Sequence, residues 1–302
     1  MAGLVSTFTD VIGPVLLIGA AGYALGRRRI AEAKTLSSLS VAVLIPALTF
    51  FALTTSALSR TTLAQFTGYS LLQFALIGIV ITLAARIYGW DGTATTGFLL
   101  ATLFSNSGNA GLPLALFAWG SAGLTAAAGF FAVQSVLVTV LAAYLAARAG
   151  AGTLRAVHAL LRLPVTYAIA AGLLLNLLGI APPPPIAKAT QLLANGTVAV
   201  MLLLVGVQLT EVHLAGEWRG IAFATVTRLL VAPVLAWGTA PLLGLDGVAR
   251  QTSILLASLP TAVTAAIWAS EFAVAPALVS SVVVVTTLLS PLTITVLLVL
   301  LH

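Results

Sequence analysis

A polar stretch interrupts a long apolar run in the first half of the chain. It reads SNSGNAGLP from Ser105 to Pro113. Glycine is a poor helix former, proline lacks a backbone donor, and asparagine and serine side chains compete for backbone groups, so a helix should break here. The side chains of Asn106, Ser107 and Asn109 would then hydrogen-bond a small polar ligand. The alternative is a proline kink with small residues for close packing, which leaves the two asparagines unexplained.

A second stretch of the same kind lies in the other half of the chain. It reads LPTAVT from Leu259 to Thr264. Broken backbone inside a bilayer must be covered by protein or face a water-filled cavity, because unsatisfied N–H and C=O groups cost several kcal/mol there. The half-helix N-termini near Pro113 and Pro260 would offer a positive dipole end to an anion, whereas unwound carbonyls suit a cation. We therefore expect both breaks, with Thr261 and Thr264, to line one site.

Three further polar side chains stand within apolar runs. Arg228 lies about nine residues into the run 219–242, or about 13 Å by helical rise. It could pair with an anionic substrate, take the place of a coupling cation, or donate to carbonyls freed by a broken helix. Gln73 is its approximate counterpart in the other half, and Gln134 lies in the run 123–147. A lone glutamine in such a run is more often a link between helices than a ligand, but Gln134 and Arg228 both remain candidate lining residues.

The other ionisable residues argue against several kinds of chemistry. The acidic residues all fall at or beyond the ends of the apolar runs: Asp10, Glu32, Asp91, Glu211, Glu217, Asp246 and Glu271. The histidines lie in loops or at the terminus: His158, His213 and His302. This placement disfavours a buried carboxylate relay, a Ser-His protease and a metal site, and a chain without cysteine has no thiolate ligand or disulfide. We expect no cofactor and no enzymatic activity.

Composition sets the environment of these residues. The chain has 302 residues, of which 60% are hydrophobic and 7% are charged, and its mean hydropathy is +1.15. A soluble domain carries roughly a quarter of its residues charged, so a membrane protein is predicted. Apolar runs of about 20 residues favour helices over the alternating strands of a barrel. Ten spans are predicted, at 11–26, 37–58, 67–87, 94–118, 123–147, 164–180, 190–210, 219–242, 250–270 and 276–301. Little chain lies outside them, which leaves no room for a catalytic or nucleic-acid-binding domain.

Loop charges predict how the spans are oriented. The first span has no basic residue ahead of it and is followed by Arg27, Arg28 and Arg29, the reverse of a secretory signal. With the N-terminus outside, one side receives Arg27, Arg28, Arg29, Lys34, Arg86, Arg148, Arg155, Arg162 and Arg219, and the other only Arg60, Lys188 and Arg250. The side with more basic residues is normally the cytoplasmic one. The protein is therefore expected in the cytoplasmic (inner) membrane of a bacterium, with both termini on the outer side of that membrane.

The two halves of the sequence echo each other. PV at 14–15 recurs at 164–165, AAG at 20–22 at 170–172, VAV at 41–43 at 198–200, and DG at 91–92 at 246–247. These matches keep their order at an offset of about 150 to 157 residues. Five spans per half place the second half upside down in the membrane, which is an inverted-repeat plan of secondary transporters. The predicted repeats are 1–147 and 164–302, joined by a basic cytoplasmic linker at 148–163.

These features resemble the auxin efflux carrier family, within the wider group of bile-acid and arsenite transporters, from end to end. The residues that carry the resemblance are GYALGRRR at 22–29, LIPAL at 44–48, NSGNAGLPLA at 106–115, PPPP at 182–185, LVGVQL at 204–209, RLLVAP at 228–233 and ASLPTA at 257–262. The stretch 106–115 is the most specific of them.

The resemblance implies an all-α polytopic membrane protein of ten transmembrane helices in two inverted five-helix repeats, with broken helices 4 and 9 crossing at the substrate site. It also implies a scaffold of spans 1, 2, 6 and 7, a mobile transport domain of spans 3 to 5 and 8 to 10, and often a homodimer. Family substrates are organic anions: indole-3-acetate in plants, and dicarboxylates such as malate or malonate for some bacterial members.

The chain also departs from two groups of relatives. It lacks the long hydrophilic loop that plant carriers insert between the halves. It lacks the acidic residue that holds sodium in the ninth span of bile-acid symporters, where Ala257 and Ser258 stand. With Arg228 near the crossing in the electrostatic role of a bound cation, uniport or a coupling without that sodium site is favoured.

The prediction is therefore a secondary transporter that moves a small carboxylate across the lipid bilayer by elevator-like alternating access, with no nucleic-acid partner. Its expected substrate-binding residues are Asn106, Ser107, Asn109, Pro113, Gln134, Arg228, Pro260, Thr261 and Thr264. Two alternatives stay open: a sodium-coupled symporter for bile-acid-like anions, and a membrane sensor that binds a ligand without moving it.

Overall fold

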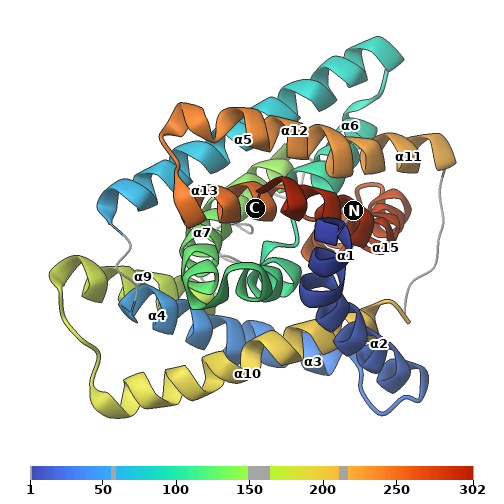
Figure 1. The fold of residues 1–302 in the computed structure, drawn as a ribbon. Helices are drawn as coiled ribbons and strands as arrows, with labels where there is room; N and C mark the ends of the chain where they lie inside the picture. The colour runs from blue at the N-terminus through green and yellow to red at the C-terminus, as the bar shows by residue number, and fades with distance from the viewer. Residues whose placement is uncertain (1, 56–58, 149–163, 211–216, 302) are drawn as a thin grey trace.

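The computed structural model describes residues 2–55, 59–148, 164–210 and 217–301, and within these ranges every regular element is a helix (Figure 1). Seven helical segments are long and apolar enough to cross a membrane: Val5–Arg27, Ala33–Thr55, Arg60–Tyr88, Ser107–Ala142, Pro184–Gln208, Trp218–Leu243 and Pro276–Leu301. The predicted spans 94–118 and 250–270 are each divided between two helices, and 164–180 coincides with a shorter helix of 15 residues. The predicted linker beyond residue 148, and the last residues of the second predicted span, 56–58, lie outside the described ranges.

The first half of the chain folds into helices that are joined by short loops and π-helical segments. The α-helices are α1 Ala2–Thr7, α2 Gly13–Arg27, α3 Ala33–Leu39, α4 Ile45–Thr55, α5 Arg60–Tyr88, α6 Gly92–Leu103 and α7 Leu112–Arg148. The π-helical segments η1 Phe8–Ile12, η2 Ser40–Leu44 and η3 Ser107–Gly111 precede α2, α4 and α7. α7 consists of two helices that meet at a kink, because Trp119 and Gly120 have non-helical backbone angles and Gly120 has a φ of 61°. The kink falls between the predicted spans 94–118 and 123–147.

The second half has a similar make-up. Its α-helices are α9 Pro164–Leu178, α10 Pro184–Gln208, α11 Trp218–Val226, α12 Ala232–Thr239, α13 Gly247–Ala257, α14 Val263–Glu271 and α15 Pro276–Leu301. The π-helical segment η4 Thr227–Val231 joins α11 to α12, and the short 3₁₀ helix η5 Pro241–Leu243 follows α12.

Each π-helical segment ends two residues before a proline. The four segments are followed by Pro14, Pro46, Pro113 and Pro233. A proline ring clashes with the carbonyl four residues earlier and lacks the N–H that would bond to it. A turn widened to i→i+5 spacing ahead of the proline relieves that clash, so the prolines account for the four segments.

The helices pack in two groups. In one group α10 packs on α2 and α4, and α4 packs on α9. In the other, α5 packs on α6, α7 and α12, and α15 packs on α6, α11 and α14. Figure 1 shows α10, α3 and α4 along the lower side of the molecule and α5, α11 and α12 along the upper side. α7 lies between the groups and contacts α4 and α10 as well as α5 and α13.

Glycines bring α2 and α10 into close contact. A Cβ atom at Gly206 would collide with the carbonyl oxygen of Gly19, and one at Gly22 would collide with the backbone of Leu203. Small residues at such contacts let membrane helices approach until their backbones touch, which supplies van der Waals attraction where lipid offers no hydrophobic drive. α2 and α10 therefore form the closely packed centre of the lower group.

Candidate functional site

The first polar stretch lies where one helix ends and another begins. α6 ends at Leu103, and Phe104 continues with extended backbone angles (φ −98°, ψ 107°). Asn106 takes the N-cap position of η3, which starts at Ser107 and continues into α7. The glycines and the proline that follow do not favour a regular α-helix, so the backbone leaves helical geometry here.

The second polar stretch lies at a matching interruption. α13 ends at Ala257, and Ala262 has extended backbone angles (φ −68°, ψ 140°) before α14 begins at Val263. Pro260, inside the interruption, cannot donate a backbone hydrogen bond.

The two interruptions hydrogen-bond each other. Ser105 and Thr261 form an isolated antiparallel β bridge. The two backbone hydrogen bonds around it are each 2.8 Å long, from Asn106 N–H to the Pro260 carbonyl and from Ala262 N–H to the Phe104 carbonyl. Each break thus supplies partners for main-chain groups that the other leaves free, as buried backbone in a bilayer requires.

Thr261 is fully buried and adds two further links. Its hydroxyl donates to the carbonyl of Ala101 in α6 over 2.6 Å. Its N–H donates to Thr286 Oγ1 of α15 over 3.1 Å. Thr261 therefore links the second break to the last turn of α6 through its side chain and to α15 through its backbone.

Arg228 of η4 satisfies three more carbonyls. Its Nη1 donates to Thr102 over 2.9 Å, its Nε to Leu259 over 2.6 Å and its Nη2 to Ala257 over 2.5 Å. The side chain is 1% exposed. Every nitrogen of the guanidinium is therefore engaged with backbone.

Gln134 of α7 hydrogen-bonds two side chains of the first break. Its Nε2 donates to Ser105 Oγ over 3.2 Å, and its Oε1 accepts from Ser107 Oγ. The two serines flank Asn106 in the sequence, so Gln134 restrains the side chains on both sides of it. Gln134 therefore links α7 to the residues between α6 and η3, as a glutamine within an apolar helix commonly does.

A cavity of about 330 Å³ lies beside the breaks. The predicted substrate-binding residues that line it are Asn106, Ser107, Asn109, Gln134 and Thr264. Those that are not among its lining residues are Pro113, Arg228, Pro260 and Thr261. In the described part of the chain, the side-chain amides of Asn106 and Asn109 have no hydrogen-bond partner. These two amides are available to a ligand.

A second cavity, of about 660 Å³, adjoins the first. The two share Ser37, Asn106, Gln208, Val263 and Ile267 as lining residues. The larger cavity extends to the N-terminal ends of α3 and α15, where Ala33, Lys34, Pro276 and Ala277 line it.

The electrostatics of the two cavities favour a negative ligand. Among their described lining residues, Lys34 is the one charged side chain. Gly108 and Asn109 at the start of η3, and Val263 and Thr264 at the start of α14, also line the smaller cavity. First-turn N–H groups lack partners within their helix and carry the positive end of its dipole. Two such helix starts and one lysine therefore face the cavities.

The sequence did not indicate which polar residues from other helices line the smaller cavity together with the breaks. Ser37, Ser40 and Gln208, from α3, η2 and α10, line the smaller cavity. Ser40 Oγ and Gln208 Oε1 are buried and have no hydrogen-bond partner within the described residues. Gln208 stands in the LVGVQL stretch that supported the resemblance, and Ser37 and Ser40 open the second predicted span. Their polar character was visible, but their position beside the breaks depends on which helices pack together.

The described part of the chain is helical, has several segments long and apolar enough to cross a membrane, and holds a cavity with polar side chains among its lining at two hydrogen-bonded helix breaks; these are features of a multi-pass membrane transporter. The chain belongs to the Membrane transport protein family, whose sequence model matches residues 7–298. This match confirms the resemblance to auxin efflux carriers.

An uncharacterised transporter of Methanothermobacter thermautotrophicus is 29% identical over 287 residues, which cover 93% of this chain and 94% of the relative. A putative malonate transporter of Rhizobium meliloti is 31% identical over 272 residues, which cover 86% and 84%. An uncharacterised transporter of Methanocaldococcus jannaschii is 24% identical over 298 residues, which cover 94% and 96%.

Proposed function

We propose that the protein is a secondary transporter of a small organic anion and that the cavity beside the helix breaks is its binding site. The observation that carries this proposal is the meeting of two free amides, Asn106 and Asn109, with two helix N-termini at one cavity. Amide donors and helix N-termini stabilise a carboxylate without an opposing fixed charge that would hold it too tightly for release. The proposed activity involves no cofactor and no chemical change to the anion.

A dicarboxylate is the proposed substrate. One carboxylate would lie at Asn106 and Asn109, and the second would point into the larger cavity toward Lys34. The relative of Rhizobium meliloti that is named as a putative malonate transporter supports this class.

The proposed fold is ten spans in two inverted repeats, with the broken fourth and ninth spans crossing at the site. Three observations support it: the ordered sequence echoes, the interruption of one helix in each half, and the hydrogen bonds between those interruptions. Assembly into a homodimer remains a prediction from the family resemblance.

The proposed mechanism is an elevator motion of one helix group against the other. The scaffold would be the lower group, α2, α3, α4, α9 and α10, which supplies the cavity wall of Ser37, Ser40 and Gln208. The transport group would carry both breaks and the bound anion. A cavity lined from both groups supports this mechanism, because sliding one wall past the other would expose the anion to opposite sides in turn.

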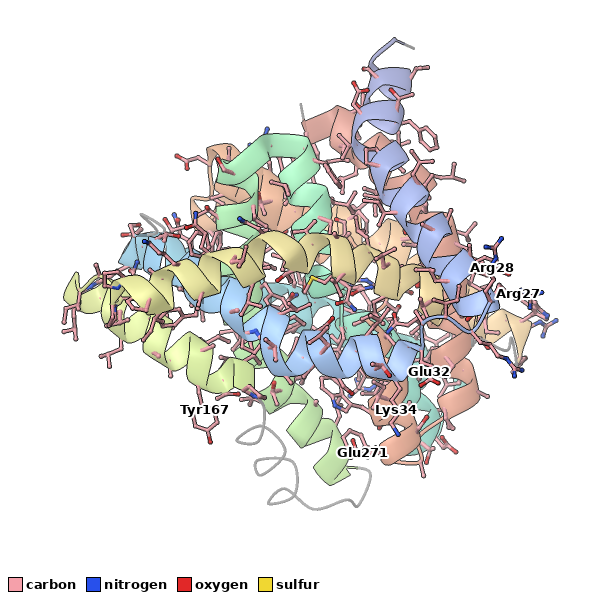
Figure 2. All side chains as sticks on the ribbon, turned by 90° about the horizontal axis from the view of Figure 1, so that it is seen from below. Arg27, Arg28, Glu32, Lys34, Tyr167 and Glu271 are labelled. Carbon is pink, nitrogen blue, oxygen red and sulfur yellow. The ribbon has the colours of Figure 1, made fainter. Side chains whose placement is uncertain are left out.

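We place the protein in a bacterial cytoplasmic membrane with both termini outside. Figure 2 shows Arg27, Arg28, Glu32 and Lys34 around the end of α2 and the start of α3, and Lys34 also lines the larger cavity. The excess of basic residues makes this the proposed cytoplasmic side. A cavity that reaches Lys34 would therefore be open to the cytoplasm, in an inward-facing state.

Flux into proteoliposomes tests the proposal. Purified protein should take up a radiolabelled dicarboxylate such as malonate, and Asn109→Ala should reduce uptake at least tenfold while leaving the thermal unfolding midpoint unchanged. The matched control is Asn195→Ala, an exposed asparagine of α10 that lines neither cavity. Wild-type uptake by Asn109→Ala would refute the proposed site.

The two alternatives have their own signatures in the same vesicles. A sodium-coupled symporter for bile-acid-like anions would lose uptake when sodium is replaced by choline. A sensor would bind its ligand without flux across the sealed membrane. Proton and sodium gradients imposed separately distinguish these cases from uniport.

A further inference from the structure

Arg228 is the largest fully buried side chain of the described part of the chain. It lies in η4, the π-helical segment ahead of Pro233. Its charge has no acidic neighbour to balance it, since the described acidic residues are all exposed: Asp10, Glu32, Asp91, Glu217, Asp246 and Glu271. A buried cation without a carboxylate partner must be stabilised by dipoles.

The three acceptors of Arg228 share one structural position. Thr102 lies in the last turn of α6, Ala257 is the last residue of α13, and Leu259 follows it closely. The final carbonyls of a helix lack intrahelical donors and carry the negative end of its dipole. In the broken helices of transporters, such carbonyl ends are where cations are coordinated. The guanidinium therefore lies where the negative ends of both broken helices meet.

Arg228 is separate from the proposed anion site. It is not among the lining residues of either large cavity, whereas it borders a small void of about 10 Å³ together with Ser105 and Gln134. A void of that size holds about one water molecule. The anion cavity lies at the N-terminal ends of η3 and α14, and Arg228 lies at the C-terminal ends of α6 and α13.

We propose that Arg228 is a resident cation: its guanidinium fills a cation-binding site formed by the carbonyl ends of both broken helices, so no sodium or potassium ion binds at the crossing. The side chain holds the two breaks together in every step of transport. The proposal rests on the geometry of the breaks and not on the identity of the substrate, so its test uses stability and not flux.

The wild-type protein gives the first test. Its thermal unfolding midpoint in detergent should be the same in sodium, potassium and choline chloride at equal ionic strength, because the site is already filled. A saturable rise in the midpoint with sodium or potassium would overturn the proposal, since a ligand that binds only the folded state raises its stability.

Arg228→Ala gives the second test, because it empties the site. The variant should unfold at a lower temperature than wild type, and millimolar methylguanidinium should raise its midpoint in a saturable way. Arg219→Ala is the matched control, since Arg219 is an exposed residue of the adjoining α11. Methylguanidinium should not stabilise this control or the wild type.

Two outcomes of the second test would overturn the proposal. One is an Arg228→Ala variant as stable as wild type, and the other is a destabilised variant that methylguanidinium does not rescue. If Arg228→Ala yields no folded protein, methylguanidinium in the growth and extraction media should restore a folded fraction, and failure to do so counts against the proposal.

Discussion

Polar side chains at the two breaks divide into those that hold the backbone and those left free. Gln134 donates to Ser105 and accepts from Ser107, whereas Arg228 and Thr261 donate to backbone carbonyls at or beside the breaks. Asn106 and Asn109 have no such bonds in the described part of the chain. All five were candidates from sequence because each is polar within an apolar run. Which of them bonds to protein depends on the partner helix, and a single sequence does not carry that information.

Ser40→Ala should weaken transport without reducing stability. The Ser40 hydroxyl is buried and has no partner within the described residues, so its removal costs no hydrogen bond within the protein. A hydrogen bond to a charged group contributes about 1.5 to 3 kcal/mol, which corresponds to a rise in the substrate KM of roughly tenfold to a hundredfold. Uptake kinetics in proteoliposomes and the thermal unfolding midpoint measure the two effects.

Ser253→Ala is the control for this prediction. Ser253 Oγ is also buried without a partner in the described chain, but it lies in α13 and lines neither cavity. Both variants should keep the wild-type midpoint. If the substrate KM of Ser40→Ala equals that of Ser253→Ala, Ser40 does not bind the substrate.

Lys34→Met should raise the KM for dicarboxylates by a small factor. Lys34 is exposed at the mouth of the larger cavity, where an ion pair contributes at most about 1 kcal/mol, or roughly a fivefold change in KM. The effect should shrink as salt is added, because exposed charges are screened. Lys188→Met, an exposed lysine of α10 outside both cavities, is the matched control. A salt-independent change, or an equal change in the control, would argue against a role in attraction of the anion.

At the scale of the elements, the local sequence predicts where helices end but not which helices pack together. The position of the first break follows from asparagine, glycine and proline in the chain itself and that of the second from Pro260, and the kink at Trp119 and Gly120 lies between two predicted spans. The π-helical segments were not predicted, although each is explained afterwards by a following proline. The packing of α10 on α2 and α4 could not be predicted, because small residues are abundant on many of these helices.

Gly206→Ala should destabilise the protein, and Gly196→Ala should not. Both glycines lie in α10, but a Cβ at Gly206 meets the carbonyl of Gly19, whereas one at Gly196 has no heavy atom within 4 Å. Overpacking costs about 1 to 3 kcal/mol, while alanine in an open helical position gains up to about 1 kcal/mol over glycine. Thermal unfolding midpoints in detergent should therefore move in opposite directions. Equal midpoints would mean that α2 and α10 do not pack closely.

At the scale of the whole molecule, the proposed binding site is lined by both helix groups. The breaks lie in the upper group, while Ser37, Ser40 and Gln208 come from the lower one. A binding site shared in this way is complete in only some relative positions of the groups. If the groups move as an elevator, fixing them together across the cavity should stop transport, whereas fixing two helices within one group should not.

Paired cysteines test this motion in a chain that has no cysteine of its own. Ser37→Cys with Ile267→Cys places thiols on α3 and α14, both lining the cavities, and a bifunctional maleimide should block uptake by joining the groups. In the control, Lys188→Cys with Leu192→Cys places two exposed thiols one turn apart on α10, outside both cavities, so the same reagent joins positions within the lower group. Each pair is compared with its single-cysteine variants treated in the same way. Full uptake after crosslinking of the first pair would exclude an elevator motion, because the anion would then cross without any displacement between the groups.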